Sequence, residues 1–127
     1  MGGVISVVGS ESPRITENIA VTGNIDVTGE VLADKAYIAE TTLTDGATIN
    51  WDMSTQSVSK VTLGGNRTMA APTNGSTGQF CSILVIQDGT GSRTLTWNAV
   101  FEFASDTAPT LTTTASLGDL FTFRYNG

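Results

Sequence analysis

The sequence predicts an all-β fold, in which an extended β segment precedes an antiparallel, jelly-roll-like β-sandwich head. Of the 127 residues, 46 are Gly, Thr or Ser, and only 14% are charged. Thr favours strands because its Cβ is branched, and Gly supplies tight turns. No segment shows convincing helical periodicity, and turn signals recur at the short spacing that is typical of sandwiches and barrels.

A six-residue repeat marks the N-terminal part of the chain. Residues 18–23 (NIAVTG) are followed by residues 24–29 (NIDVTG) and by a degenerate copy at 30–35 (EVLADK). Alternate positions are apolar or Gly, so the apolar side chains share one face of an extended chain. So few copies cannot build a solenoid core alone. We therefore predict that neighbouring copies of the chain intertwine here in a homotrimer, with an ordinary strand of a single sandwich as the alternative. The predicted trimer interface consists of Ile19, Val21, Ile25, Val27 and Val31.

The rest of the chain contains nine apolar or alternating segments that are bounded by turn residues. These predicted strands are residues 36–43, 47–52, 58–63, 67–70, 79–87, 92–98, 100–103, 110–114 and 119–125. Residues 79–87 (QFCSILVIQ) are the predicted central strand, because their nearly continuous apolar character requires cover on both faces. The loop at 88–91 (DGTG) is predicted to close a hairpin. The predicted head core consists of Trp51, Leu84, Ile86, Trp97, Phe101, Phe103, Phe121 and Phe123.

Charge divides the chain into two parts. Residues 1–52 carry eight acidic and two basic side chains, whereas residues 53–127 carry four of each. We expect an N-terminal arm (1–17) that contacts a neighbouring subunit, an extended trimerisation segment (18–44) and a head (45–127). The acidic first half opposes binding to nucleic acid or to an anionic membrane, since both require clustered Lys and Arg.

Residues that could carry catalysis or hold a cofactor are few. The chain has no His, which excludes a Ser-His-Asp triad and any His-based metal site. Cys81 lies in the most apolar predicted strand and is expected to be an unreactive core residue. Asp88 alone offers too few oxygens for calcium. Trp51 and Trp97 could stack on sugars or bases, but their positions in alternating strands favour core packing. We predict no catalytic residue, no metal and no cofactor.

Several segments of the C-terminal region occur together in one known class of proteins. They are residues 45–52 (DGATINWD), 61–69 (VTLGGNRTM), 72–74 (PTN), Gly78, 84–97 (LVIQDGTGSRTLTW), 101–103 (FEF) and 119–123 (DLFTF). Together they resemble a β-rich module shared by the capsid decoration, tail-fibre and baseplate proteins of tailed bacteriophages. The six-residue repeat is similar to trimeric β-fibre segments that often precede such heads. The resemblance covers residues 45–127, implies a structural virion component, and brings no catalytic residue with it.

Two functions are consistent with this resemblance. The chain begins with Met and is short, so we expect a complete small protein and, as the main hypothesis, a capsid decoration (cement) protein. It would bind the major capsid protein as a homotrimer on the outer surface of the assembled head and stabilise it. The residues expected to contact the capsid are Val4, Ile5, Val7, Val8 and Arg14.

The alternative hypothesis is a short tail-fibre, baseplate or head-fibre protein that binds a host surface receptor. An aromatic and polar cluster exposed at the tip of the head would favour it. A carbohydrate-binding β-sandwich outside any virion is a third hypothesis, which leaves the six-residue repeat without a purpose.

Overall fold

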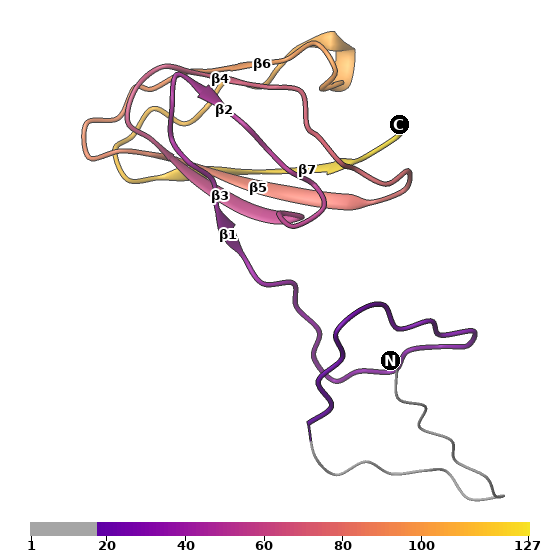
Figure 1. Ribbon diagram of the computed structural model, residues 1–127. Coiled ribbons are helices and arrows are strands. Elements are labelled where there is room, and N and C mark those ends of the chain that lie inside the picture. The colour runs from indigo at the N-terminus through magenta and orange to yellow at the C-terminus, as the bar shows by residue number, and fades with distance from the viewer. Residues whose placement is uncertain (1–17) are drawn as a thin grey trace, which may run out of the picture. The chain divides into compact units, whose positions relative to one another are not determined.

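The structure is a computed structural model that describes residues 18–127 (Figure 1). The chain divides into two units at the boundary between Lys35 and Ala36. Residues 18–35, the described part of the first unit, contain no strand, and every one of them is exposed. The predicted capsid-contact residues Val4, Ile5, Val7, Val8 and Arg14 lie outside the described residues.

The second unit, residues 36–127, contains the predicted head (45–127) together with residues 36–44 and is called the head from here on. Its described strands form two facing sheets (Figure 1). Sheet A has the order β1-β3-β5-β7, and sheet B has the order β2-β4-β6. The strands are β1 (Thr41–Thr42), β2 (Thr48–Ile49), β3 (Val58–Leu63), β4 (Arg67–Met69), β5 (Phe80–Gln87), β6 (Leu95–Trp97) and β7 (Gly118–Arg124). The only helical element among the described residues is a short 3₁₀ turn, η1 (Ala104–Asp106).

Most strand pairs are parallel, so the predicted antiparallel jelly roll is wrong. The chain alternates between sheets from β1 to β7, and each strand from β3 to β6 pairs in parallel with the strand two places earlier. Only β7 runs antiparallel to its neighbour β5. The turn at 88–91 therefore carries the chain from sheet A to sheet B and closes no hairpin. A tight turn reverses the chain, so it cannot join two parallel neighbours of one sheet. The chain instead passes through the other sheet between them.

From β1 to β6 the chain winds as a coil, in which each turn passes from sheet A to sheet B and back. Side chains at the corners between the two sheets join successive turns of this coil. The Asp45 carboxylate, which follows β1, accepts a hydrogen bond from the Gly64 N–H (3.1 Å) and pairs with Arg67 (2.7 Å) around β4. The Arg67 guanidinium holds the pKa of Asp45 below its ordinary value. Asn66 Oδ1 accepts a hydrogen bond from the Thr94 N–H (3.1 Å) at the next corner. These contacts fix the corners of consecutive turns above one another and so favour parallel stacking.

The corner at Asp88 is a closed turn in which the carboxylate is bonded within the chain. The Asp88 carboxylate accepts hydrogen bonds from the N–H groups of Thr90 and Gly91 (both 2.9 Å) and pairs with Arg93 (2.8 Å). Gly91 has φ +75°, and a Cβ there would lie 2.5 Å from the Thr113 carbonyl oxygen. Within residues 18–127, no group of three or more His, Cys, Asp or Glu side chains could hold a metal ion.

The core lies between the sheets. Along β5 the buried residues are Cys81, Ile83, Val85 and Gln87, whereas Leu84 and Ile86 are half-buried on the opposite face. Leu84 and Ile86 were predicted to belong to the core, and this prediction is wrong. A continuous apolar run does not reveal which alternate set of side chains faces inward. The core residues are Leu43, Ile49, Trp51, Met53, Val61, Leu63, Met69, Cys81, Ile83, Val85 and Leu111.

Two predicted strands, 100–103 and 110–114, are absent from the ladders of the described sheets. Both belong to the long connection from β6 to β7. That connection is held by isolated backbone hydrogen bonds, such as the one from the Ser92 N–H to the Thr113 carbonyl (2.8 Å). A side chain holds it too, because the Asp119 carboxylate accepts hydrogen bonds from the Thr112 N–H (2.7 Å) and hydroxyl (2.8 Å). Leu111 is nevertheless buried, so the apolar signal of residues 110–114 reflects packing of a loop on the core.

Candidate binding cavity beside the last strand

An aromatic cluster fills the space between the edges of the two sheets formed by β6 and β7. Trp97 of β6 lies with its ring centroid 5.0 Å from those of Phe101 and Phe121, and Phe123 lies 5.1 Å from Phe101. Trp51 stacks on Phe101 at 6.4 Å, with an interplanar angle of 11°. The remaining predicted aromatic core residue, Phe103, contacts Trp97 at 5.4 Å. Both Trp rings are thus packed inside the head.

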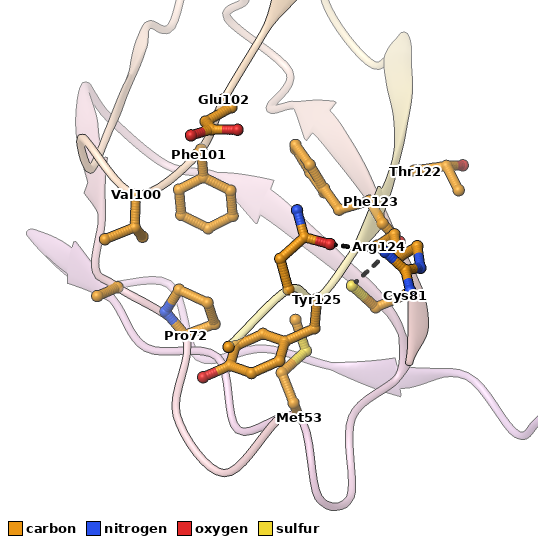
Figure 2. Close-up of a pocket in the computed structure, with 13 residues that line it drawn as sticks. Met53, Pro72, Cys81, Val100, Phe101, Glu102, Thr122, Phe123, Arg124 and Tyr125 are labelled. Carbon is orange, nitrogen blue, oxygen red and sulfur yellow. Dashed lines mark hydrogen bonds between the residues drawn. The ribbon is translucent and has the colours of Figure 1, made fainter. Parts of the chain in front are cut away.

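A cavity of about 390 Å³ adjoins this cluster. It lies between β7, which is an edge strand of sheet A, and residues 100–102, which follow β6. Figure 2 shows the rings of Phe101, Pro72 and Tyr125 around one opening, with Met53 below and Glu102 and Arg124 at the periphery. Segments far apart in the sequence therefore build the cavity together.

The Tyr125 ring is positioned by the loop before β5. The Tyr125 N–H donates to the Gln79 carbonyl (2.8 Å), and the Tyr125 carbonyl accepts from the Gly78 N–H (2.8 Å). The ring lies directly over Gly75, where an added Cβ would approach three ring carbons to 2.6–2.8 Å. Only Gly therefore allows the ring to occupy this place.

The two charged residues of the cavity have no ion-pair partner in the described head. Glu102 makes no hydrogen bond or ion pair there, and Arg124 forms no ion pair but donates to Asn126 Oδ1 (2.9 Å). The other described basic residues of the head are all paired: Lys60 with Glu40 (2.6 Å), Arg67 with Asp45 (2.7 Å) and Arg93 with Asp88 (2.8 Å). The cavity thus offers one unpaired carboxylate and one guanidinium without a counter-ion.

The one thiol in the lining of the cavity, Cys81, is buried, and burial raises the pKa of that thiol. The Cys81 Sγ lies 3.6 Å from the Phe123 carbonyl oxygen, to which it donates. A thiol of this kind is a weak nucleophile. Apolar walls with a few polar groups are typical of small-ligand sites.

The predicted trimer-interface residues have no cover in the described structure. Ile19, Val21, Ile25, Val27 and Val31 are between 46% and 75% exposed. A second apolar surface, the outer face of sheet A, was not predicted. It carries Phe80 and Leu120, which are 69% and 68% exposed, beside the half-buried Leu84 and Ile86. Its sequence signal is the nearly continuous apolar character of β5.

The cavity residues Glu102, Arg124 and Tyr125 were also not predicted as a site. No motif joins them, because their proximity depends on how the connection between β6 and β7 folds back. The one cue in the sequence is Gly75, in the turn-rich loop at 72–78. The need for Gly at this position becomes clear only when the Tyr125 ring, which lies over it, has been placed.

Comparison with known proteins gives one match. The model of the family described as "Putative phage tail fibre C-terminal domain" matches residues 12–127, which include both the six-residue repeat and the head. No curated protein and no solved structure matches the chain. In residues 18–127, no helix is long and apolar enough to cross a membrane.

Proposed function

The chain belongs to the phage tail fibre C-terminal domain family, and from this premise we propose that it is a non-enzymatic tail-fibre component whose head recognises a receptor on the host surface. The family match favours the tail-fibre alternative over capsid decoration. It also supports the tail fibre, and not the outer surface of the capsid, as the location of this virion protein. Contact with a major capsid protein, which belongs to the decoration hypothesis, stays an untested prediction.

The cavity beside β7 is the observation that supports receptor recognition. It combines an apolar, aromatic wall with two charged groups that have no ion-pair partner in the described head, namely the Glu102 carboxylate and the Arg124 guanidinium. Leaving charged groups unpaired beside an apolar wall adds nothing to folding stability.

Adsorption of the parental phage tests this function. Host cells are incubated with the purified full-length protein before phage is added, and free phage is counted after a fixed time. The protein is expected to occupy receptors and to slow adsorption in proportion to its concentration. Heat-denatured protein is the control. If native protein neither slows adsorption nor binds the cells, the proposed receptor role is wrong.

We further propose that the chain assembles with copies of itself as a homotrimer through the apolar row at 18–35. The row is exposed along its length in a single chain. The outer face of sheet A supports self-assembly too, because sheets with parallel strands are normally covered on both faces. Leu84 and Leu120, which are register neighbours on that face, would be buried by a neighbouring head.

The oligomeric state tests this assembly. Ile25→Asp places a charge in the apolar row and is expected to reduce the molar mass measured by light scattering from about three chains to one. Asp26→Ser, on the opposite face of the same extended segment, is the matched control and is expected to leave the mass unchanged. A wild-type protein that is monomeric at high concentration would contradict the proposal.

A further inference from the structure

The size and walls of the cavity suit a small ring as its ligand. Its volume of about 390 Å³ lies near the lower end of small-ligand sites, which span roughly 300–1,000 Å³. Phe101, Pro72 and Tyr125 supply flat, apolar surfaces around the opening (Figure 2). A flat molecule or one with a flat C–H face can lie against such rings.

The Tyr125 ring is a preorganised platform. One side of it rests on the Gly75 backbone, and two backbone hydrogen bonds hold its main chain to Gln79 and Gly78. A ring that is already fixed loses little conformational entropy when a ligand stacks on it. The built contact with Gly75 distinguishes Tyr125 from an ordinary surface tyrosine.

The polar groups of the cavity require a ligand that both donates and accepts hydrogen bonds. An ionised carboxylate such as Glu102 only accepts, and a guanidinium such as Arg124 only donates. Both belong to the lining, and each lacks an ion-pair partner in the described head. An anionic ligand would be attracted by Arg124 but repelled by Glu102, and a cationic ligand the reverse, so a net charge on the ligand brings no overall gain. Hydroxyl groups satisfy both residues without adding charge.

The geometry points to a neutral pyranose unit of a host surface saccharide as the ligand of this cavity, an inference that rests on the proposed receptor role. The C–H face of the sugar ring stacks on Tyr125 beside Phe101. Glu102 accepts hydrogen bonds from sugar hydroxyls, and Arg124 donates to sugar oxygens. Gly75 is a positioning residue, since it touches the Tyr125 ring and not the sugar.

Titration of the full-length protein with defined sugars, followed by ¹H–¹⁵N NMR, tests the inference. The probes are the methyl glycosides of glucose, galactose, mannose and N-acetylglucosamine, with glucuronic acid and glucosamine as charged comparisons. At least one neutral probe is expected to cause saturable shifts that centre on Tyr125, Gly75 and Glu102. The charged sugars are expected to bind more weakly than the best neutral probe.

Variants assign the contacts. Tyr125→Ala is expected to weaken binding about tenfold, the scale of one lost aromatic contact. Glu102→Gln keeps the side-chain shape at an exposed position and is expected to weaken binding with the spectrum otherwise unchanged, so the test does not depend on a variant that could unfold. Gly75→Ala should weaken binding by displacing the ring. Tyr37→Ala removes an exposed tyrosine outside the cavity lining and is the matched control.

Three results would overturn the inference: no saturable shifts with any probe, shifts that Tyr125→Ala and Glu102→Gln leave unchanged, or a charged sugar that binds more tightly than every neutral one. If the protein still slows phage adsorption in that case, the receptor role stands and only the ligand assignment fails. If adsorption is also unaffected, the receptor role fails as well.

Discussion

The two faces of β5 should respond very differently to the loss of the same number of atoms. Ile83 is fully buried in the core, whereas its neighbour Leu84 lies on the outer face of sheet A and is half-buried. Truncating either residue to Ala removes three carbon atoms. Ile83→Ala and Leu84→Ala therefore form a matched pair that tests which face of the strand points inward.

The expected costs follow from burial. Three buried carbons at about 0.8 kcal/mol each give roughly 2.4 kcal/mol for Ile83→Ala, and the cavity left in the core raises this to about 3–4 kcal/mol. Leu84 is only partly removed from water in a single chain and leaves no enclosed cavity. Leu84→Ala should therefore cost about 1 kcal/mol in the monomer.

Urea unfolding, followed by tryptophan fluorescence, measures the difference. With a urea dependence of about 2 kcal/mol per M, the midpoint should fall by roughly 1.5–2 M for Ile83→Ala and about 0.5 M for Leu84→Ala. The comparison is made at a protein concentration low enough for the chain to be monomeric, since association adds concentration-dependent stability. A Leu84→Ala variant that loses as much stability as Ile83→Ala would refute the inward orientation of Ile83.

Three further predictions follow from single groups of the head. The buried Cys81 thiol, whose pKa burial raises, should react with a disulfide reagent at pH 8 far more slowly in native protein than in urea, and equal rates would contradict its burial. The Arg93 guanidinium, with the Gly91 N–H next, lowers the pKa of Asp88 from 3.8 to about 2. Because the folded pKa is the lower one, this stability is present above pH 4 and is lost as pH falls towards 2. Asp88→Asn should therefore flatten the fall in Tm over that range, and an unchanged slope would count against the ion pair. Gly91→Ala should lower Tm much more than Gly89→Ala. Gly91 has a positive φ, and a Cβ there would lie 2.5 Å from the Thr113 carbonyl oxygen, whereas a Cβ at Gly89 meets nothing within 4 Å. Similar losses of Tm in the two variants would contradict the tight corner.

Local patterns of the sequence predict several elements well. Residues 58–63 are a strand with the predicted bounds, and the predicted strand at 79–87 differs from β5 by one residue. Alternation also places Phe121 and Phe123 on one face of β7, where both contact Trp97. Such features depend on neighbours in sequence, and periodicity reports them directly.

Strand pairing cannot be derived in the same way. The turn residues at 45–46, 64–66 and 88–91 have the composition of hairpin turns, yet in the structure they are corners between sheets. Their role becomes visible only through contacts between successive turns of the coil, such as that from Asp45 to Gly64 and Arg67. Residue composition is the same in both cases, so a sequence without its fold does not separate parallel from antiparallel pairing.

The cavity depends on long-range geometry even more strongly. Tyr125, Glu102 and Gly75 each look ordinary in their own segment. Their meeting requires β7 to pair with β5 and the connection after β6 to return beside it. That Arg124 has no counter-ion in the described head is likewise visible only after the partners of Lys60, Arg67 and Arg93 are known.

Immunogold labelling of intact virions tests most directly the place of this protein in the particle. Antibodies raised against the purified full-length chain are bound to phage, and the gold is located by electron microscopy. A tail-fibre component predicts gold on the tail fibres with bare capsids. Gold spread evenly over the capsid, with unlabelled fibres, would contradict the tail-fibre account and restore the decoration hypothesis.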